Sequence, residues 1–169
     1  LLSTKPPLTT PSPPTEDEIR LNNNTWPTHY TLEVKSDQGN DQFSGTVHIE
    51  ITVKQDIELL RVHCKNLEIK DYQLKDSKGV HVDLKNVEII SRLELCLFVP
   101  NKTIPKNNYT LTIKYAGKFV AGQITGFYKT NYTTVDNQVH YLTATKFEPT
   151  YARMAFPCFD EPKFKAKFD

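Results

Sequence analysis

Apolar and polar residues alternate along much of the chain, which is the pattern of half-buried β-strands. The clearest case is residues 46–54, where valines and isoleucines occupy every second position and polar residues lie between them. Tyr30, Leu32 and Val34 share one face of another such stretch, and residues 109–115 repeat the pattern. Shorter or less regular apolar stretches predict further strands at residues 58–63, 67–74, 80–84, 87–90, 93–99 and 138–144.

Turn-forming residues separate these stretches at short intervals, as at Asp37–Asn40 and Asp76–Gly79. No stretch with the helical period reaches the length of a helix. Short strands with one apolar face each are typical of antiparallel sheets that have one wet side. We therefore predict an all-β domain, built as an antiparallel β-sandwich or a saddle-like open sheet.

The first 18 residues have a different composition, with five of the eleven prolines and several Ser and Thr residues among them. This predicts a flexible stalk or linker over residues 1–18, or simply a disordered terminus. One domain is expected over residues 19–169. The chain begins at Leu1 without a methionine, so we expect a processed or trimmed chain and leave open a signal or anchor before it.

Overall composition excludes some classes of function. Hydrophobic residues make up 38% of the 169 residues and charged residues 24%, which is ordinary for a soluble globular protein. The net charge is +1 without a basic or acidic block, which argues against nucleic acid as a partner. No apolar run has the length that crosses a bilayer.

Cysteines and sequons bear on the compartment. Cys64, Cys96 and Cys158 lie far apart and form no CxxC pair, so we expect no zinc site and predict that all three are buried and unpaired. Chance matches are one explanation of the Asn-x-Ser/Thr sequons, but we favour a secretory-pathway protein with glycans on its surface. The sequons lie at Asn23, Asn101, Asn108 and Asn131.

The alternation stops at residues 145–162, where three prolines, five charged residues and three phenylalanines are crowded together. This composition predicts neither a central strand nor a long helix. Glu148 lies between Phe147 and Pro149, and the proline holds it out of the helical region. A carboxylate on a rigid, aromatic-lined turn is suited to bind a cation. The alternatives are a plain surface acid and an ion pair with Arg153.

Other candidate residues carry less information. His29, His48 and His81 are predicted to be solvated surface residues. The chain contains no HExxH motif, no GxSxG motif and no glycine-rich phosphate loop. Three glycines within residues 117–126 predict special backbone angles or a close backbone approach, with a tight connection between two sheets as the alternative.

Three groups of residues carry a resemblance to a known family. The segments are Arg20-Leu21 with Pro27 and His29-Tyr30, then Gly126-Phe127-Tyr128, then Phe147-Glu148-Pro149-Thr150, Ala152-Arg153, residues 155–162, Phe164-Lys165-Ala166 and Phe168. Together they resemble the M1 family of zinc aminopeptidases over about residues 20–169, the last group being its long hallmark. The chain departs from the family pattern at Asn22, where proline is usual, and at Lys146, where glutamine is usual.

The resemblance implies the N-terminal β domain of a metalloaminopeptidase, a zinc hydrolase that removes amino acids from the N-terminus of peptides. Glu148 corresponds to the glutamate that binds the α-ammonium group of the substrate. Lys146 corresponds to the residue lining the pocket for the first substrate residue, where a lysine is expected to disfavour Lys and Arg. The GxMEN and HExxH-x18-E motifs of the family are absent. The resemblance therefore implies zinc in the parent enzyme, but no catalytic residue, metal site or cofactor within this sequence.

The resemblance also implies two partners, the N-terminus of a peptide and the catalytic domain of the same parent chain. Residues 156–162 are expected to form a rigid joint between the two domains, braced by Arg153 with Asp160 or Glu161. Together with the sequons, the resemblance predicts a membrane-anchored ectodomain on the extracellular side of the plasma membrane, or a secreted or endoplasmic reticulum protein. Two other readings stay open, namely a non-catalytic β-sandwich binding or receptor module and a related M1 enzyme with epoxide hydrolase chemistry.

Overall fold

The computed structural model describes residues 14–169 and confirms the all-β prediction. Helical structure within these residues is limited to α1 (Glu16–Ile19) and two 3-10 turns, η1 (Ser91–Leu93) and η2 (Ala152–Met154). The strands are β1 (Thr25–Asp37), β2 (Gln42–Val53), β3 (Leu60–His63), β4 (Glu68–Asp76), β5 (His81–Val82), β6 (Leu84–Ile90), β7 (Leu95–Pro100), β8 (Asn107–Lys118), β9 (Gly126–Thr133), β10 (Val139–Lys146) and β11 (Lys167–Phe168).

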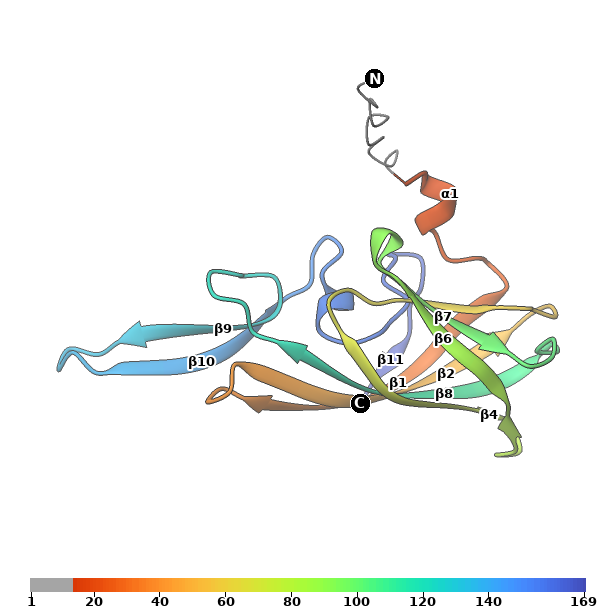
Figure 1. Cartoon of the computed structure of the whole chain (residues 1–169), viewed down its shortest axis with the longest axis horizontal. Helices are drawn as coiled ribbons and strands as arrows, with labels where there is room; N and C mark the ends of the chain where they lie inside the picture. Colours follow the sequence, from red (N-terminus) through yellow and green to blue (C-terminus); the bar gives the residue numbers. More distant parts are fainter. Residues whose placement is uncertain (1–13) are drawn as a thin grey trace, which may run out of the picture.

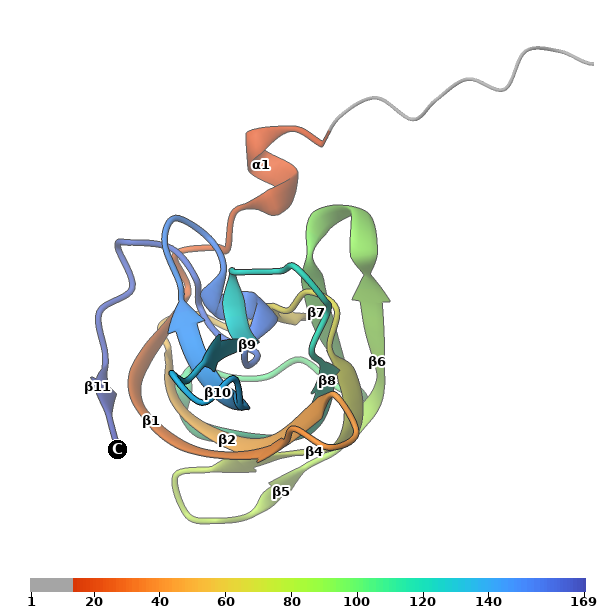
Figure 2. The ribbon, with the colours of Figure 1, turned by 90° about the vertical axis from the view of Figure 1, so that its left-hand side faces the viewer.

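The strands form three sheets (Figure 1). The largest has the order β11-β1-β2-β8-β4-β5, and its pairs are antiparallel except for β1 and β11, which are parallel. A smaller sheet has the order β3-β7-β6, and β9 and β10 form a separate two-stranded ribbon. Figure 2 shows the large sheet curving like a trough, with β6 and β7 rising along one side. The ribbon extends away from the rest of the domain (Figure 1).

The strongest alternation in the sequence became the centre of the large sheet. Val47, Ile49, Ile51 and Val53 of β2 are at most 2% exposed, and β8 pairs with β2 along its whole length. In β1, Tyr30 is buried as predicted, but Val34 is 41% exposed. The last five residues of β1 are all exposed, so this end of the strand runs beyond the core.

The core lies between the two larger sheets. The rings of Tyr72 in β4 and Phe98 in β7 meet across it, with centroids 5.4 Å apart. The segment after η2 closes the core at one end, because Cys158 forms an antiparallel bridge with His63 of β3. Residues 155–159, which the sequence marked as irregular, are therefore all buried.

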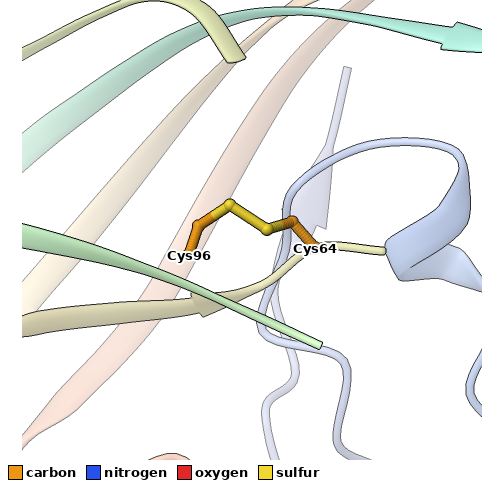
Figure 3. Close-up of a disulfide and its surroundings, with 2 residues drawn as sticks. All are labelled: Cys64 and Cys96. Carbon is orange, nitrogen blue, oxygen red and sulfur yellow. A yellow bond between two sulfur atoms is a disulfide. The ribbon is translucent and has the colours of Figure 1, made fainter. Parts of the chain in front are cut away.

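The prediction of three unpaired cysteines is wrong for two of them. Cys64 and Cys96 form a disulfide between the end of β3 and β7, with Cα atoms 5.8 Å apart (Figure 3). The two strands are neighbours in the small sheet, so residues that are separated by 32 positions in sequence come face to face. Cys158 is buried with a free thiol, as predicted.

Secondary structure begins earlier than the expected boundary of the domain at residue 19. Helix α1 starts at Glu16, and Glu18 forms an ion pair with Arg92 of η1, with 2.6 Å between the charged atoms. Most of the stalk predicted for residues 1–18 lies outside the described residues.

Candidate functional site

The hallmark segment begins where the ribbon ends. Lys146 is the last residue of β10, and it pairs with Gly126, the first residue of β9. The chain then turns through Phe147, Glu148 and Pro149 and enters η2. The turn is closed by a hydrogen bond of 2.7 Å from the Tyr151 amide to the Phe147 carbonyl oxygen. Glu148 is therefore carried by a short turn between the ribbon and the body of the domain.

Glu148 lies at the edge of an aromatic groove of about 320 Å³. Its side chain is exposed. The Phe147 and Phe156 rings meet edge to face at 5.9 Å, and the Tyr30 and Phe168 rings stack at 4.6 Å. All four rings line the groove together with Glu148, so the carboxylate lies at an aromatic surface.

Arg153, the partner considered for Glu148, is used elsewhere. Its side chain is 8% exposed and makes ion pairs with Asp160 at 2.9 Å and with Glu94 at 3.1 Å. A further hydrogen bond of 3.1 Å runs from the guanidinium to the Asp160 carbonyl oxygen. The ion-pair reading of Glu148 is therefore wrong. The predicted pairing of Arg153 with Asp160 is present, whereas its role in a joint between domains stays a prediction.

Glu94 is the member of this network that the sequence did not reveal. It lies in the turn between η1 and β7, on the small sheet, and also pairs with Lys65 at 2.5 Å. Burial acts to raise the pKa of Glu94, but the hydrogen bond and charge of Lys65, together with Arg153, outweigh it and hold the pKa below its ordinary value. The network therefore ties the segment after Glu148 to the small sheet, which the same segment also meets through the bridge between Cys158 and His63.

Glu161 makes a different contact from the predicted brace. Its carboxylate accepts a hydrogen bond of 2.6 Å from the Leu21 amide and pairs with Lys163 at 3.2 Å and Arg20 at 3.4 Å. Burial acts to raise its pKa, but the Leu21 amide and Lys163 lower it by more. Glu161 therefore fastens the segment that leads into β1, whereas Asp160 holds Arg153.

His63 was not singled out from the sequence, yet it links the same two segments. Its ring is buried, and Nδ1 accepts a hydrogen bond of 3.2 Å from the Asp160 amide. The neutral ring therefore carries its proton on Nε2, which lies 3.1 Å from the Ile19 carbonyl oxygen and donates to it. Burial lowers the pKa of His63 to about 4, and the positive charge of Arg153 contributes to the shift.

The glycine-rich stretch forms the entry to the ribbon. Gly126 has a φ of +70°, and a Cβ added there would lie 2.7 Å from the Cβ of Met154 in η2. The close backbone approach predicted for this stretch is confirmed. Phe127 packs edge to face on Phe43 and Phe119, so the base of the ribbon is fixed to the body of the domain.

A lysine fastens the ribbon farther along β9. Lys129 forms an ion pair with Asp41 and donates a hydrogen bond of 2.8 Å to the Gln38 carbonyl oxygen, both in the turn between β1 and β2. Its ammonium group also lies 4.5 Å from the centre of the Tyr141 ring in β10. The ribbon, which ends at Lys146 just before the turn that carries Glu148, is thus attached to the body of the domain at its base and along one face.

The four sequon asparagines are exposed, and they lie in the approach to β1, the β7–β8 connection, the start of β8, and β9. Of the three histidines predicted to lie at the surface, only His81 is fully exposed. His29 and His48 are half-buried, and His29 pairs with Asp169 at 2.8 Å. No group of three or more His, Cys, Asp or Glu side chains within residues 14–169 is arranged to hold a metal ion.

Comparison with known proteins identifies the family. A family model described as the Peptidase M1 N-terminal domain matches residues 26–169. The chain belongs to this family. It is 35% identical to endoplasmic reticulum aminopeptidase 1 of Homo sapiens, over 90% of this chain and 16% of that protein. It is 33% identical to glutamyl aminopeptidase of Rattus norvegicus, over 89% of this chain and 16% of that protein.

A third relative is the thyrotropin-releasing hormone-degrading ectoenzyme of Homo sapiens, 30% identical over 96% of this chain and 16% of that protein. The chain thus spans about a sixth of the length of these relatives. The resemblance read from residues 20–169 is confirmed. In the part of the chain that the structure describes, no helix is long and apolar enough to cross a membrane.

Proposed function

We propose that this M1 N-terminal domain belongs to a zinc-dependent aminopeptidase and that Glu148 binds the α-ammonium group of its peptide substrates. The observation that carries the proposal is the state of Glu148, which is exposed at an aromatic groove while Arg153 is engaged by other carboxylates. Family membership supports the class of reaction, since several relatives are named as aminopeptidases.

Zinc is the metal that the family implies. The described residues do not fit it, because they contain no cluster of three metal-ligating side chains. We therefore propose that the zinc ligands lie in another part of the protein, and we derive no step through the metal. The contribution of this domain is recognition, by an anionic group that pairs with the charged end of a peptide.

The charge of Glu148 explains how an enzyme of this kind restricts cleavage to the first residue of a peptide. A free N-terminus carries an ammonium group, whereas an acetylated N-terminus or an internal peptide bond carries none. The Glu148 carboxylate pairs with the ammonium group and finds no charge on a blocked end, so the free N-terminus binds best.

Lys146 is proposed to influence the choice of the first substrate residue. Its side chain is exposed at the end of β10, two positions before Glu148. Like charges repel, so a lysine here disfavours peptides that begin with Lys or Arg. With the full-length enzyme, the Lys146→Gln variant is expected to gain activity on Arg substrates relative to Glu substrates. A wild-type preference for Arg would contradict the proposal.

We also propose the partners and the compartment. The partners are the N-terminus of a peptide and the catalytic domain of the same chain, and we expect residues 156–162 to form the joint to that domain. The compartment is the endoplasmic reticulum or the outside of the plasma membrane. Two relatives are named for the endoplasmic reticulum and as an ectoenzyme, and the Cys64–Cys96 disulfide is typical of an oxidising compartment.

The test uses the Glu148→Gln variant of the full-length enzyme, because glutamine preserves the shape and removes the charge. We expect kcat/KM on peptides with a free N-terminus to fall by the equivalent of about 2–4 kcal/mol. The matched control is Glu33→Gln, which removes an exposed carboxylate from β1. An unchanged kcat/KM in the Glu148→Gln variant would overturn the role of Glu148.

A further inference from the structure

A second hollow, of about 370 Å³, lies between the end of β8 and the start of β4. One wall is the turn after β8, with Val120 and Gln123, and another is Met154 of η2. None of its lining residues belongs to the aromatic groove at Glu148. Its volume lies in the range of about 300–1,000 Å³ that small-molecule sites occupy. The hollow is therefore a candidate ligand site that is separate from the groove.

The edge of β8 that borders the hollow lacks a strand partner. Pairing of β8 with β4 ends where Ala116 lies opposite Glu68, whereas β8 continues to Lys118. The following residue, Phe119, donates its amide to the Asp41 carbonyl oxygen on the side of β2, at 2.8 Å. Backbone groups of successive strand residues point to opposite sides, so the N–H and C=O of Lys118 point to the side of β4. The hollow thus has an open backbone edge.

Asn66 explains why β4 does not cover this edge. By the register of the two strands Asn66 would lie opposite Lys118, but its φ is +57°. This left-handed conformation turns the chain out of the strand. The side chain of Asn66 lines the hollow instead, and its amide makes no hydrogen bond within residues 14–169. It offers a second donor beside the N–H of Lys118.

The charges at the rim favour a negatively charged ligand. Glu68 and Lys70 pair with each other at 2.5 Å. The Lys118 ammonium group also lines the hollow and forms no ion pair with residues 14–169. One positive charge is therefore left without a counter-charge, next to the amide donors of Lys118 and Asn66. A carboxylate is acceptor-only and suits a site with an ammonium group and two N–H donors.

The other walls define the rest of the ligand. Ala116, Val120 and Met154 offer apolar surface, and the thioether of Met154 adapts to different shapes. The open edge is short, because β4 occupies β8 up to Ala116 and a turn closed by the Gln123 amide at Val120 follows Lys118. Addition of a peptide strand needs a longer free edge. The hollow therefore suits a small molecule with one apolar part.

Contacts of the fold hold the walls together. The Gln123 side chain donates a hydrogen bond of 3.0 Å to the Thr125 carbonyl oxygen, and the Thr125 hydroxyl lies 3.9 Å from the Met154 sulfur. On the other side, the Lys65 amide donates to the Arg153 carbonyl oxygen at 2.9 Å. The turn after β8, the start of β4 and η2 are thus joined around the hollow.

We propose that this hollow binds small amphipathic carboxylates, with the carboxylate at Lys118 and Asn66 and the apolar part against Val120 and Met154. The charge, the open N–H and the apolar walls select this class together, because a neutral ligand leaves Lys118 unmatched and a fully polar one leaves the apolar walls uncovered. The assignment rests on the hollow alone and is independent of the role proposed for Glu148.

The test is an NMR titration of the 169-residue chain, in which Met154 is the only methionine, so that an isotope label on methionine methyl groups reports on the hollow. Hexanoate is the probe, hexanamide lacks its charge, and acetate lacks its apolar part. We expect hexanoate to shift the Met154 signal to saturation and to bind about tenfold or more tighter than either control. No shift with hexanoate overturns the proposal. Equal affinities for hexanoate and either control overturn the ligand class.

Variants locate the carboxylate. Lys118→Gln removes the charge, and Asn66→Gly removes the side-chain amide while glycine accepts the positive φ. We expect each to weaken hexanoate binding by about fivefold or more. The matched control is Lys114→Gln, which removes another exposed lysine of β8 whose partner, Asp71, lies outside the hollow. Wild-type affinity in Lys118→Gln, or an equal loss in Lys114→Gln, overturns the assignment.

Calorimetry with the full-length protein then tests whether the hollow is accessible there. We expect hexanoate to bind the full-length protein and to bind the Lys118→Gln variant about fivefold or more weakly. Binding to the 169-residue chain without binding to the full-length protein would show that another domain covers the hollow, and this result overturns the proposal.

Discussion

His63 makes the stability of this domain depend on pH in a window that can be worked out in advance. The buried ring accepts a hydrogen bond from the Asp160 amide and donates one to the Ile19 carbonyl oxygen, and only the neutral form does both. Burial and the charge of Arg153 lower its pKa from the ordinary 6.5 to about 4. The unfolded chain therefore binds a proton at a pH where the folded protein does not.

The magnitude follows from linkage. Because the pKa of His63 is lower in the folded state, the protein loses stability as the pH falls through the unfolded value of 6.5. The loss levels off below about pH 4. One pKa unit corresponds to about 1.4 kcal/mol, so between about pH 7.5 and about pH 5 the free energy of unfolding falls by about 2 kcal/mol. Glu94 and Glu161 have lowered pKa values as well, but their ordinary value is 4.5, so most of their loss falls below this window.

The assay is urea unfolding of the 169-residue chain at the two pH values, without reductant so that the disulfide stays intact. The control is His63→Gln, which offers an amide acceptor and donor but does not titrate. We expect the wild type to lose about 2 kcal/mol more than the variant on acidification. If wild type and variant show the same pH dependence, His63 does not keep its neutral form in the folded protein and the reasoning is refuted.

Two further predictions use matched variants and the same unfolding assay. Tyr30→Phe is expected to cost about 1–3 kcal/mol, because the Tyr30 hydroxyl accepts a hydrogen bond from the Phe159 amide. Tyr115→Phe is expected to cost less than about 1 kcal/mol, because that buried hydroxyl has no partner among residues 14–169. Equal losses in the two variants would contradict this contrast. Arg153→Met is expected to cost about 3–5 kcal/mol, because it leaves the largely buried Asp160 carboxylate without a counter-charge, whereas Glu94 keeps Lys65. Arg92→Met, at an exposed pair, is expected to cost about 0–1 kcal/mol. A loss below about 1 kcal/mol for Arg153→Met would show that the network is not stabilising.

The fold was largely predictable because most strands carry one buried and one wet face. Val47 to Val53 in β2 show this with almost no exposure of the apolar side chains. The strand β9 was missed for the opposite reason. Its residues after Gly126 are all half-buried or exposed, so the sequence contains no apolar stripe that marks a strand. The pairing of β9 with β10 supplies the regularity that its own residues do not show.

The site was only partly predictable, since some of its contacts join residues that are distant in sequence. Glu94 and Arg153 are 59 positions apart, and nothing in the residues around Glu94 points to Arg153. The Cys64–Cys96 pair depends in the same way on the neighbourhood of β3 and β7. A signal for the disulfide did exist, because the four sequons already indicated a secretory compartment, where cysteines pair.

The acidic residues of the hallmark segment differ in what the fold leaves available. Within residues 145–162 these are Glu148, Asp160 and Glu161. Asp160 pairs with Arg153. Glu161 accepts a hydrogen bond from the Leu21 amide and pairs with Arg20 and Lys163. Both carboxylates are used to shape the segment, because removing either would leave buried partners without a counter-charge or acceptor. Glu148 takes no part in these contacts and lies exposed at the groove, so among the three it is the carboxylate that a cationic ligand can reach.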